Sequence, residues 1–136
     1  MTKVYLSLGS NLGDKEENIH KAIKKIEEQV GVVVRQSALI KTEPWGFQSD
    51  NGFVNAAVCV ETSLSPREVL HRTQAIERAL GRNHKSINGI YHDRLIDIDI
   101  LLYGDETIDE PDLKIPHPLM KERDFVMIPL EEIMDT

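Results

Sequence analysis

One run, Leu95-Ile96-Asp97-Ile98-Asp99-Ile100-Leu101-Leu102, constrains the fold more than any other part of the sequence. Successive side chains of a β-strand point to opposite faces, so this alternation predicts a strand from Leu95 to Tyr103. The apolar face of that strand, which should pack into the core, consists of Ile96, Ile98, Ile100 and Leu102. Asp97 and Asp99 then share the opposite face, about 7 Å apart along the backbone.

Two carboxylates directed at one place repel each other unless a cation lies between them. Oxygen ligands favour a hard ion, and Mg²⁺ held together with a phosphate-bearing substrate is the usual occupant. The pair Asp97 and Asp99 therefore indicates a magnesium site. The alternative is a solvent-facing strand surface on which aspartate happens to alternate.

The segment before this strand, residues 82–94, is locally basic. It holds three basic residues, one acidic residue and two histidines, which are Arg82, Lys85, Arg94, Asp93, His84 and His92. A basic loop leading into paired carboxylates is typical of a polyphosphate site, where arginines stabilise charge on a transferring group. The alternative is a solvated loop. No G-x-x-x-x-G-K-[ST] sequence is present, so the chain is not a P-loop enzyme.

Three other groups of residues are candidates for ligand binding. Phe53 and Asn55 alternate on one strand face, where an aromatic ring beside an amide suits a flat heterocycle, although packing under a loop would explain them equally. His117 and Arg123 lie in a proline-bounded segment that would complete a nucleotide site or form an ordinary helical turn. Gln74 and Glu77 lie one helical turn apart and face either a ligand or water.

The order of elements predicts one α+β domain over residues 1–136 with a ferredoxin-like βαββαβ sandwich. Strands are expected at 4–8, 32–40, 53–61 and 95–103, and capped helices follow Asp14 and Ser65 and end at Gly31 and Gly81. Both helices should cover one face of an antiparallel sheet, which leaves the other face open to a ligand. The proline-rich tail should add a small hairpin and one or two short helices.

Composition narrows the classes of partner. Sixteen Lys and Arg against 23 Asp and Glu give a net charge of −7, which argues against a general nucleic-acid or anionic-membrane binder. The single cysteine, Cys59, cannot form an internal disulfide. No signal-peptide pattern or apolar run of membrane-spanning length is present. A cytoplasmic monomer that acts on small molecules is expected.

Several segments, taken in order, form a joint pattern that is more specific than any one of them. They are residues 8–13, 42–44, 53–58, 73–77, 81–82, 94–101, 116–117 and 123–125. This pattern resembles the 6-hydroxymethyl-7,8-dihydropterin pyrophosphokinase family of folate biosynthesis, nearly end to end. The resemblance implies transfer of the β,γ-pyrophosphoryl group of ATP to the pterin hydroxymethyl group, with release of AMP and with two Mg²⁺ ions as cofactor.

The resemblance also implies roles for individual residues. Asp97 and Asp99 match the magnesium ligands, and Arg82 and Arg94 match catalytic arginines of the loop. The pterin-binding positions are Thr42, Pro44, Trp45, Phe53, Asn55 and Phe125. The ATP-binding positions are Gln74, Glu77, Arg82, His84, Arg94, Ile100, His117 and Arg123.

The sequence departs from the family in the basic loop. Gly89 to Arg94 replaces the common run Arg-Trp-Gly-Pro-Arg, and His84 stands where many members carry an arginine. Two rival functions remain for the residues alone. One is a regulatory domain that binds a small molecule on the same fold without metal, and the other is a metal-dependent phosphohydrolase that uses Asp-x-Asp.

Overall fold

A computed structural model describes residues 1–42, 52–81 and 95–134. In chain order the elements are β1 (Thr2–Ser10), α1 (Lys15–Gln29), β2 (Val32–Gln36), β3 (Ile40–Thr42), β4 (Phe53–Thr62), α2 (Pro66–Ala79), β5 (Asp97–Tyr103), β6 (Ile108–Glu110), β7 (Leu113–Ile115), the 3₁₀ turn η1 (Met120–Glu122) and α3 (Asp124–Ile133). Within these residues no helix is both long and apolar enough to cross a membrane.

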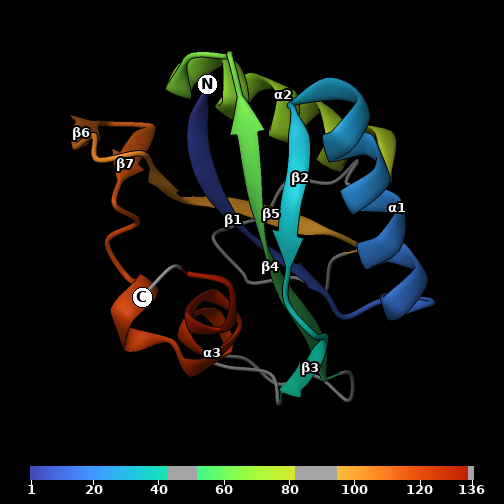
Figure 1. Ribbon diagram of the computed structural model, residues 1–136. Coiled ribbons are helices and arrows are strands. Elements are labelled where there is room, and N and C mark those ends of the chain that lie inside the picture. The colour runs from blue at the N-terminus through green and yellow to red at the C-terminus, as the bar shows by residue number, and fades with distance from the viewer. Residues whose placement is uncertain (43–51, 82–94, 135–136) are drawn as a thin grey trace.

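The main sheet is antiparallel and has the order β2-β4-β1-β5, with β3 paired beside β4. Helices α1 and α2 lie on one side of the sheet and α3 lies on the other (Figure 1). The strands β6 and β7 form a separate two-stranded hairpin. This arrangement confirms the predicted α+β, ferredoxin-like fold and the predicted hairpin and helices of the tail.

The helix boundaries follow from the capping residues that the sequence supplies. Asp14 accepts a hydrogen bond from the backbone amide of Glu17 at 3.2 Å and begins α1. Ser65 and Glu68 form a reciprocal capping box at α2, with contacts of 2.9 and 3.2 Å. Gly81 follows α2 with a φ of +113°, a conformation that glycine adopts without steric cost.

The core lies between the sheet and helices α1 and α2. Its fully buried members include Leu6 and Leu8 of β1, Ile26 of α1, and Ile76 of α2. Burying such a side chain contributes about 1.5–3 kcal/mol relative to leaving it exposed. Alternate residues of β1, β4 and β5 therefore have to face these helices, and that requirement fixes which side chains occupy the other face of the sheet.

The prediction that Leu102 shares the core face of β5 is wrong. The pairing of β5 with β1 shifts register, because Leu6 lies opposite Ile100 whereas Tyr5 lies opposite Leu102. Leu101 is therefore an extra residue, and such a bulge reverses the alternation beyond it. Tyr103 joins the main core, and Leu102 packs against a second cluster around the buried Leu101.

The face opposite α1 and α2 is only partly open, which corrects a second expectation. Helix α3 packs on this face, where its Ile133 forms a cluster with Ala57 and Cys59 of β4. Cys59 is 1% exposed, as expected for a small core residue. The predicted strand 32–40 is also divided, since β2 and β3 pair separately with β4. The rest of this face carries Ser7, Gly9 and Asn55, which are buried, and Asp97 and Asp99, which are half-buried.

Candidate active site

The candidate site is built on one row of residues that crosses three neighbouring strands. Gly9 of β1 lies opposite Asn55 of β4 on one side and opposite Asp97 of β5 on the other. Two residues earlier in β1, Ser7 lies opposite Ala57 and Asp99 in the same way. Paired residues in an antiparallel sheet point to the same face, so Asn55 and both aspartates share the face opposite the main core.

Gly9 leaves space at the centre of this row. A Cβ atom at Gly9 would lie 2.9 Å from the Asn55 side-chain nitrogen and 3.6 Å from Cδ1 of Phe53. The missing side chain therefore allows the Asn55 amide, which is 3% exposed, to lie directly on the strand. Adjacent strands are about 4.8 Å apart, so Asn55 and Asp97 are separated by about 10 Å of backbone.

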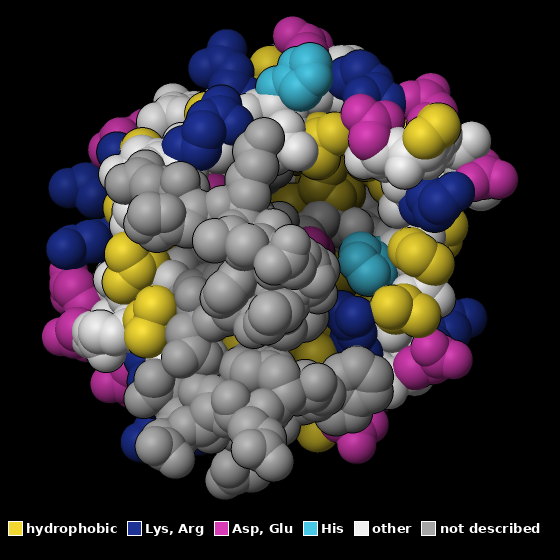
Figure 2. Space-filling model, turned by 180° about the vertical axis from the view of Figure 1, so that it is seen from behind, with side chains coloured by type: hydrophobic (Ala, Val, Ile, Leu, Met, Phe, Trp, Pro, Cys, Tyr) yellow, Lys and Arg dark blue, Asp and Glu magenta, His cyan; other side chains and the backbone are white. Residues whose placement is uncertain are grey.

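A cavity of about 250 Å³ opens beside β5. Its walls include three residues proposed from the sequence, which are Asp99, Ile100 and His117. The rest of the lining comes from Leu70, Ile98, Pro111, Asp112, Leu113, Lys114 and Pro118. The face turned away from the viewer in Figure 1 is visibly hollowed, with hydrophobic, basic and histidine side chains around the hollow (Figure 2).

One wall of this 250 Å³ cavity is the β6–β7 hairpin, which ion pairs fasten to α2. The Arg67 guanidinium donates to both carboxylate oxygens of Asp112, at 2.8 and 3.0 Å, and also to Glu110. Hydrogen bonding from Arg67 holds the pKa of the Asp112 carboxyl below its usual value. Lys114 lies opposite Asp109 in the hairpin and donates to it at 2.5 Å.

His117 is half-buried beside β5. Its backbone amide donates to the carbonyl of Leu101 at 3.0 Å, and its Nδ1 accepts from the amide of Leu119 at 3.2 Å. Burial chiefly lowers the pKa of His117, nearby Arg123 lowers it further, and Asp97 opposes the shift. With Nδ1 used as an acceptor, the neutral imidazole carries its proton on Nε2, which is a hydrogen-bond donor.

Arg123 and Phe125 approach this region from the start of α3. The guanidinium carbon of Arg123 lies 5.7 Å from the centre of the Phe125 ring, within the range of a cation–π contact. Both side chains are half-buried, and Phe125 packs against the cluster around Leu101. Helix α3 thus also brings a cation near His117 and an aromatic ring against the cluster around Leu101.

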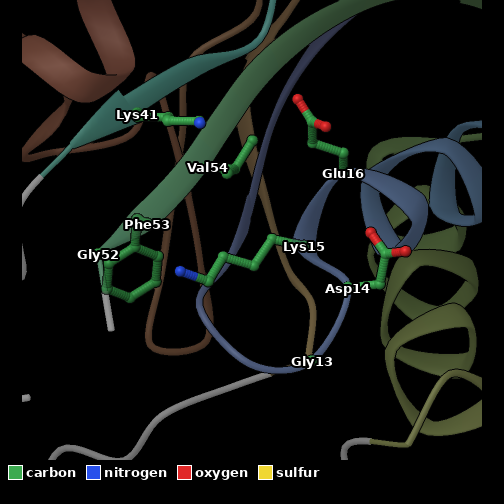
Figure 3. Close-up of a pocket in the computed structure, with 8 residues that line it drawn as sticks. All are labelled: Gly13, Asp14, Lys15, Glu16, Lys41, Gly52, Phe53 and Val54. Carbon is green, nitrogen blue, oxygen red and sulfur yellow. The ribbon is translucent and has the colours of Figure 1, made fainter. Parts of the chain in front are cut away.

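A second cavity, of about 500 Å³, lies at the other end of the site, between the start of α1 and the strands β3 and β4. Phe53 lines it together with Gly13, Asp14, Lys15, Glu16, Lys41, Gly52 and Val54. In Figure 3 the Lys15 side chain extends toward the Phe53 ring, whereas the Asp14 side chain points away from that ring. Phe53 lies two residues before Asn55, so β4 connects this cavity with the central row.

The two α2 residues proposed from the sequence have different environments. Gln74 is exposed, whereas Glu77 is only 4% exposed. The Glu77 carboxylate accepts a hydrogen bond from the backbone amide of Ile98 at 2.8 Å. The structure therefore brings Glu77 against the peptide between Asp97 and Asp99.

Some predicted site residues cannot be placed with the others. Pro44, Trp45, Arg82, His84 and Arg94 lie outside the described residues, as does the whole 82–94 segment. Thr42 is described by its backbone, which pairs with Phe53 at the end of β3. The described residues nevertheless bring together the two aspartates, Asn55 and His117 from three different parts of the chain.

The donor set at β5 fits magnesium better than a metal that needs an all-protein cage. No group of three or more His, Cys, Asp or Glu side chains in the described part of the chain could hold a metal ion. Two half-buried carboxylates, Asp97 and Asp99, leave most coordination positions to water and substrate oxygens. Mg²⁺ in phosphate-transfer sites is bound in this way, through one or two carboxylates and the substrate phosphates.

Sequence reasoning missed several residues that line the two cavities. Lys15 and Lys41 line the larger cavity, and Lys114 lines the smaller one. Surface lysines carry no periodic signal, so only the fold places them beside a cavity. Gly9 lies within β1, beyond the strand expected at 4–8, and a glycine inside a strand is a recognisable sign of close approach by another group.

These features define a class: an α+β domain whose sheet carries an acidic pair between two cavities. The chain matches the 7,8-dihydro-6-hydroxymethylpterin-pyrophosphokinase (HPPK) family over residues 5–135, and it belongs to that family. The match covers β1 from Tyr5 onward and every later element through α3.

Individual relatives agree with the family. A 2-amino-4-hydroxy-6-hydroxymethyldihydropteridine pyrophosphokinase of Porphyromonas gingivalis is 49% identical over 134 residues, which cover 98% of this chain and 91% of that protein. The enzyme of the same name from Aquifex aeolicus is 43% identical over 98% of this chain and 81% of its own length.

Solved structures support the fold alone. A crystal structure described as HPPK-DHPS in complex with substrates superposes with a TM-score of 0.76 at 14% identity, covering 97% of this chain. A Plasmodium falciparum HPPK-DHPS triple mutant superposes with a TM-score of 0.75 at 17% identity over 96% of this chain. This chain spans about two fifths of each of those longer chains, 40% in both cases.

Proposed function

We propose that this chain transfers the pyrophosphoryl group of ATP to the hydroxymethyl group of 6-hydroxymethyl-7,8-dihydropterin, with Mg²⁺ held by Asp97 and Asp99. The family carries the pyrophosphokinase activity and its place in folate biosynthesis. The ATP donor, the metal and the roles of single residues are the finer parts of the proposal. The observation that carries them is the row Asn55, Gly9 and Asp97 between the two cavities.

The smaller cavity is assigned to the nucleotide. Ile100 and Leu70 supply apolar contact for a base, and Lys114 supplies positive charge at the hairpin. The neutral His117 would donate from Nε2 to a phosphate or ribose oxygen. Asp99 lies on the wall of this cavity, so phosphates that extend from the base would reach the acidic pair.

The pterin is assigned to the sheet face that Asn55 and Phe53 share, opposite the main core. The Asn55 amide offers a donor and an acceptor to the edge of a pterin ring, and the Phe53 ring offers a stacking surface. The hydroxymethyl group would then point across Gly9 toward Asp97, because these three residues lie in one row. In this proposal the acceptor and the donor lie on opposite sides of the carboxylate pair.

In the reaction the pterin hydroxymethyl oxygen forms a bond to the β-phosphorus of ATP. The bond from that phosphorus to the bridging α,β-oxygen breaks, AMP departs with that oxygen, and the hydroxyl proton passes to solvent. Bound Mg²⁺ would neutralise phosphate charge and orient the triphosphate. The chain supplies orientation, because Asn55 and Phe53 hold the acceptor while His117 and Arg123 hold the nucleotide.

The test separates the activity from its rivals by product analysis. The protein is incubated with ATP, Mg²⁺ and 6-hydroxymethyl-7,8-dihydropterin, and the nucleotides are resolved with and without the pterin. AMP that forms only with the pterin, in step with pterin diphosphate, is the expected result. ADP and phosphate formed regardless of the pterin would identify a hydrolase. Ligand binding without turnover and without any effect of Mg²⁺ would identify a binding domain.

Substitution of the acidic pair tests the metal assignment. Asp97→Asn and Asp99→Asn should each lower kcat by about 10²-fold or more, since each removes a ligand that stabilises transferring charge. Asp105→Asn is the matched control, because Asp105 is exposed in the turn that follows β5. Near-normal turnover in both variants would overturn the assignment of the metal to this pair.

A further inference from the structure

Glu77 is a buried carboxylate for which the proposed mechanism has no chemical step. It lies on α2, is 4% exposed, and accepts a hydrogen bond from the Ile98 backbone amide at 2.8 Å. Burial of a carboxylate is costly unless the charge is hydrogen-bonded or paired. A buried carboxylate that accepts from the peptide between two proposed metal ligands calls for a functional explanation.

The position of β5 in the sheet supplies that explanation. Among the described residues, β5 is at the edge of the order β2-β4-β1-β5, and β1 is its one partner strand in this sheet. Amides along an edge strand point alternately to the partner strand and to the open edge. The Ile98 amide points to the open edge, where Glu77 meets it, while Asp97 and Asp99 are in register with Gly9 and Ser7.

We propose that Glu77 is a positioning residue for the acidic pair, acting through the Ile98 amide. It takes the place of a missing neighbour strand at this one peptide and fixes the backbone that carries Asp97 and Asp99. The proposal rests on the proposed function, since it assumes that these two aspartates bind the metal. It differs from the nucleotide contact that family resemblance implies for position 77.

The chemistry of the group agrees with this role. Metal-binding carboxylates must be held to within about 0.5 Å of their working geometry, and an edge strand with one neighbour restrains its backbone less than a central strand does. A hydrogen bond to a charged acceptor is stronger than one to a neutral acceptor. Gln74, one turn earlier on α2, is exposed, so the sheet-facing side of the helix at this level is the side that carries Glu77.

The test compares two substitutions with a matched control. Glu77→Gln keeps an oxygen acceptor of the same reach, whereas Glu77→Leu removes the acceptor at similar volume. Thr73→Val is the control, because Thr73 is 1% exposed on the same helix face and its hydroxyl donates within α2, to the Leu70 carbonyl at 3.0 Å. The readouts are hydrogen exchange of the Ile98 amide and Mn²⁺ affinity, measured by electron paramagnetic resonance with a non-cleavable ATP analogue.

Glu77→Leu should speed exchange at the Ile98 amide and weaken Mn²⁺ binding by about 10–100-fold, as loss of an outer support of a metal site does. Glu77→Gln should retain most of the Mn²⁺ affinity, and Thr73→Val all of it. Equal damage from Gln and Leu, with the Ile98 amide still protected, would overturn the proposal, because the charge itself would then matter. If Glu77→Leu does not fold, Glu77→Asp replaces it, since its shorter side chain withdraws the acceptor.

Failure of this proposal can be told apart from failure of the proposed function. The double variant Asp97→Asn, Asp99→Asn should lose Mn²⁺ binding while the Ile98 amide stays protected. Unchanged Mn²⁺ affinity in that double variant would overturn the metal site itself. Weakened affinity there, with wild-type affinity in Glu77→Leu, would overturn only the role of Glu77.

Discussion

At the scale of single residues, the candidate site contains small residues as well as charged ones, and both kinds define its shape. Gly9 separates Asn55 from Asp97, and Ser7 separates Ala57 from Asp99. Larger residues at these two positions of β1 would fill the floor between the proposed acceptor and the metal pair. The proposed binding residues lie on the flanking strands β4 and β5, and the small residues of β1 leave space between them.

Replacement of Gly9 tests this arrangement. In Gly9→Ala the new Cβ would lie 2.9 Å from the Asn55 side-chain nitrogen, so the amide must move. We expect KM for the pterin to rise about tenfold, the loss that follows when one or two hydrogen bonds are misaligned, with KM for ATP unchanged. The measurement is a double-mutant cycle by steady-state kinetics, which compares the wild type, Gly9→Ala, Asn55→Ala and the double variant. Fully additive effects of the two substitutions would show that Gly9 does not act through Asn55.

The lowered pKa of His117 predicts a pH dependence of stability. The pKa of His117 in the folded chain is lower than its ordinary value of 6.5. His117 therefore binds a proton more readily in the unfolded chain than in the folded one. The contribution of neutral His117 to the free energy of unfolding should therefore be complete above pH 6.5 and should be lost as the pH drops below that value. Carboxyls with lowered pKa values, Glu68, Asp109 and Asp112, add their losses at lower pH, below their ordinary 4.5 or 3.8.

Urea unfolding between pH 7 and pH 5 measures this slope. The substitution His117→Asn should flatten it, and His20→Asn, at an exposed histidine of α1, serves as the control. A slope that is the same in wild type and in His117→Asn would assign the effect to other groups.

Part of this residue-scale detail was predictable from the sequence. Period-two alternation placed Asp97 and Asp99 on one face, and the structure confirms that placement through their register with Gly9 and Ser7. The contact of Glu77 with the Ile98 amide joins residues 21 positions apart, and no local pattern encodes it. Whether a helical carboxylate meets water or a strand edge depends on how the helix lies on the sheet.

At the scale of elements, the sequence predicts where helices begin, because it contains their capping residues. It does not predict which elements cover the second face of the sheet. The start of α2 is predicted by its N-cap and first-turn residues, Ser65, Pro66 and Glu68. The bulge at Leu101, however, depends on pairing between β1 and β5, and it moved Leu102 away from the predicted core. The packing of α3 on the second face likewise follows from the fit of Ile133 against Ala57 and Cys59, which its own sequence does not specify.

The ion pairs between α2 and the β6–β7 hairpin belong to this scale. Arg67→Ala should release Asp112 and Glu110 and loosen the hairpin wall of the 250 Å³ cavity. Exposed ion pairs are weak, so we expect KM for ATP to rise by about fivefold or less, with kcat unchanged. Added salt should weaken these ion pairs in the wild type and should therefore also raise its KM for ATP.

Steady-state kinetics over a range of ATP concentrations checks this, with Arg67→Lys expected to be intermediate because it keeps charge but loses the two-point contact. Arg72→Ala, at an exposed position of the same helix, is the matched control. A fall in kcat at constant KM would contradict a role confined to the cavity wall.

At the scale of the whole molecule, the proposed function requires an acidic chain to bind an acidic nucleotide. The net charge is −7, and ATP adds further negative charge, so binding requires cations close to the phosphates. The described residues provide Lys114 and Arg123 near the 250 Å³ cavity and two aspartates that attract a metal ion. Nucleotide binding and metal binding should therefore depend on each other.

Thermal unfolding measures this dependence in the intact protein. A ligand that binds only the folded state at a hundredfold excess over its Kd should raise Tm by roughly 10 °C for a chain of this size. We expect that rise with a non-cleavable ATP analogue and Mg²⁺ together, and at most a small rise with the analogue and a chelator. The double variant Asp97→Asn, Asp99→Asn should show only the small rise in both conditions, because a bound metal no longer offsets the repulsion between the chain and the triphosphate. An equal rise with and without Mg²⁺ in the wild type would mean that the protein's own cations suffice and that the acidic pair has another purpose.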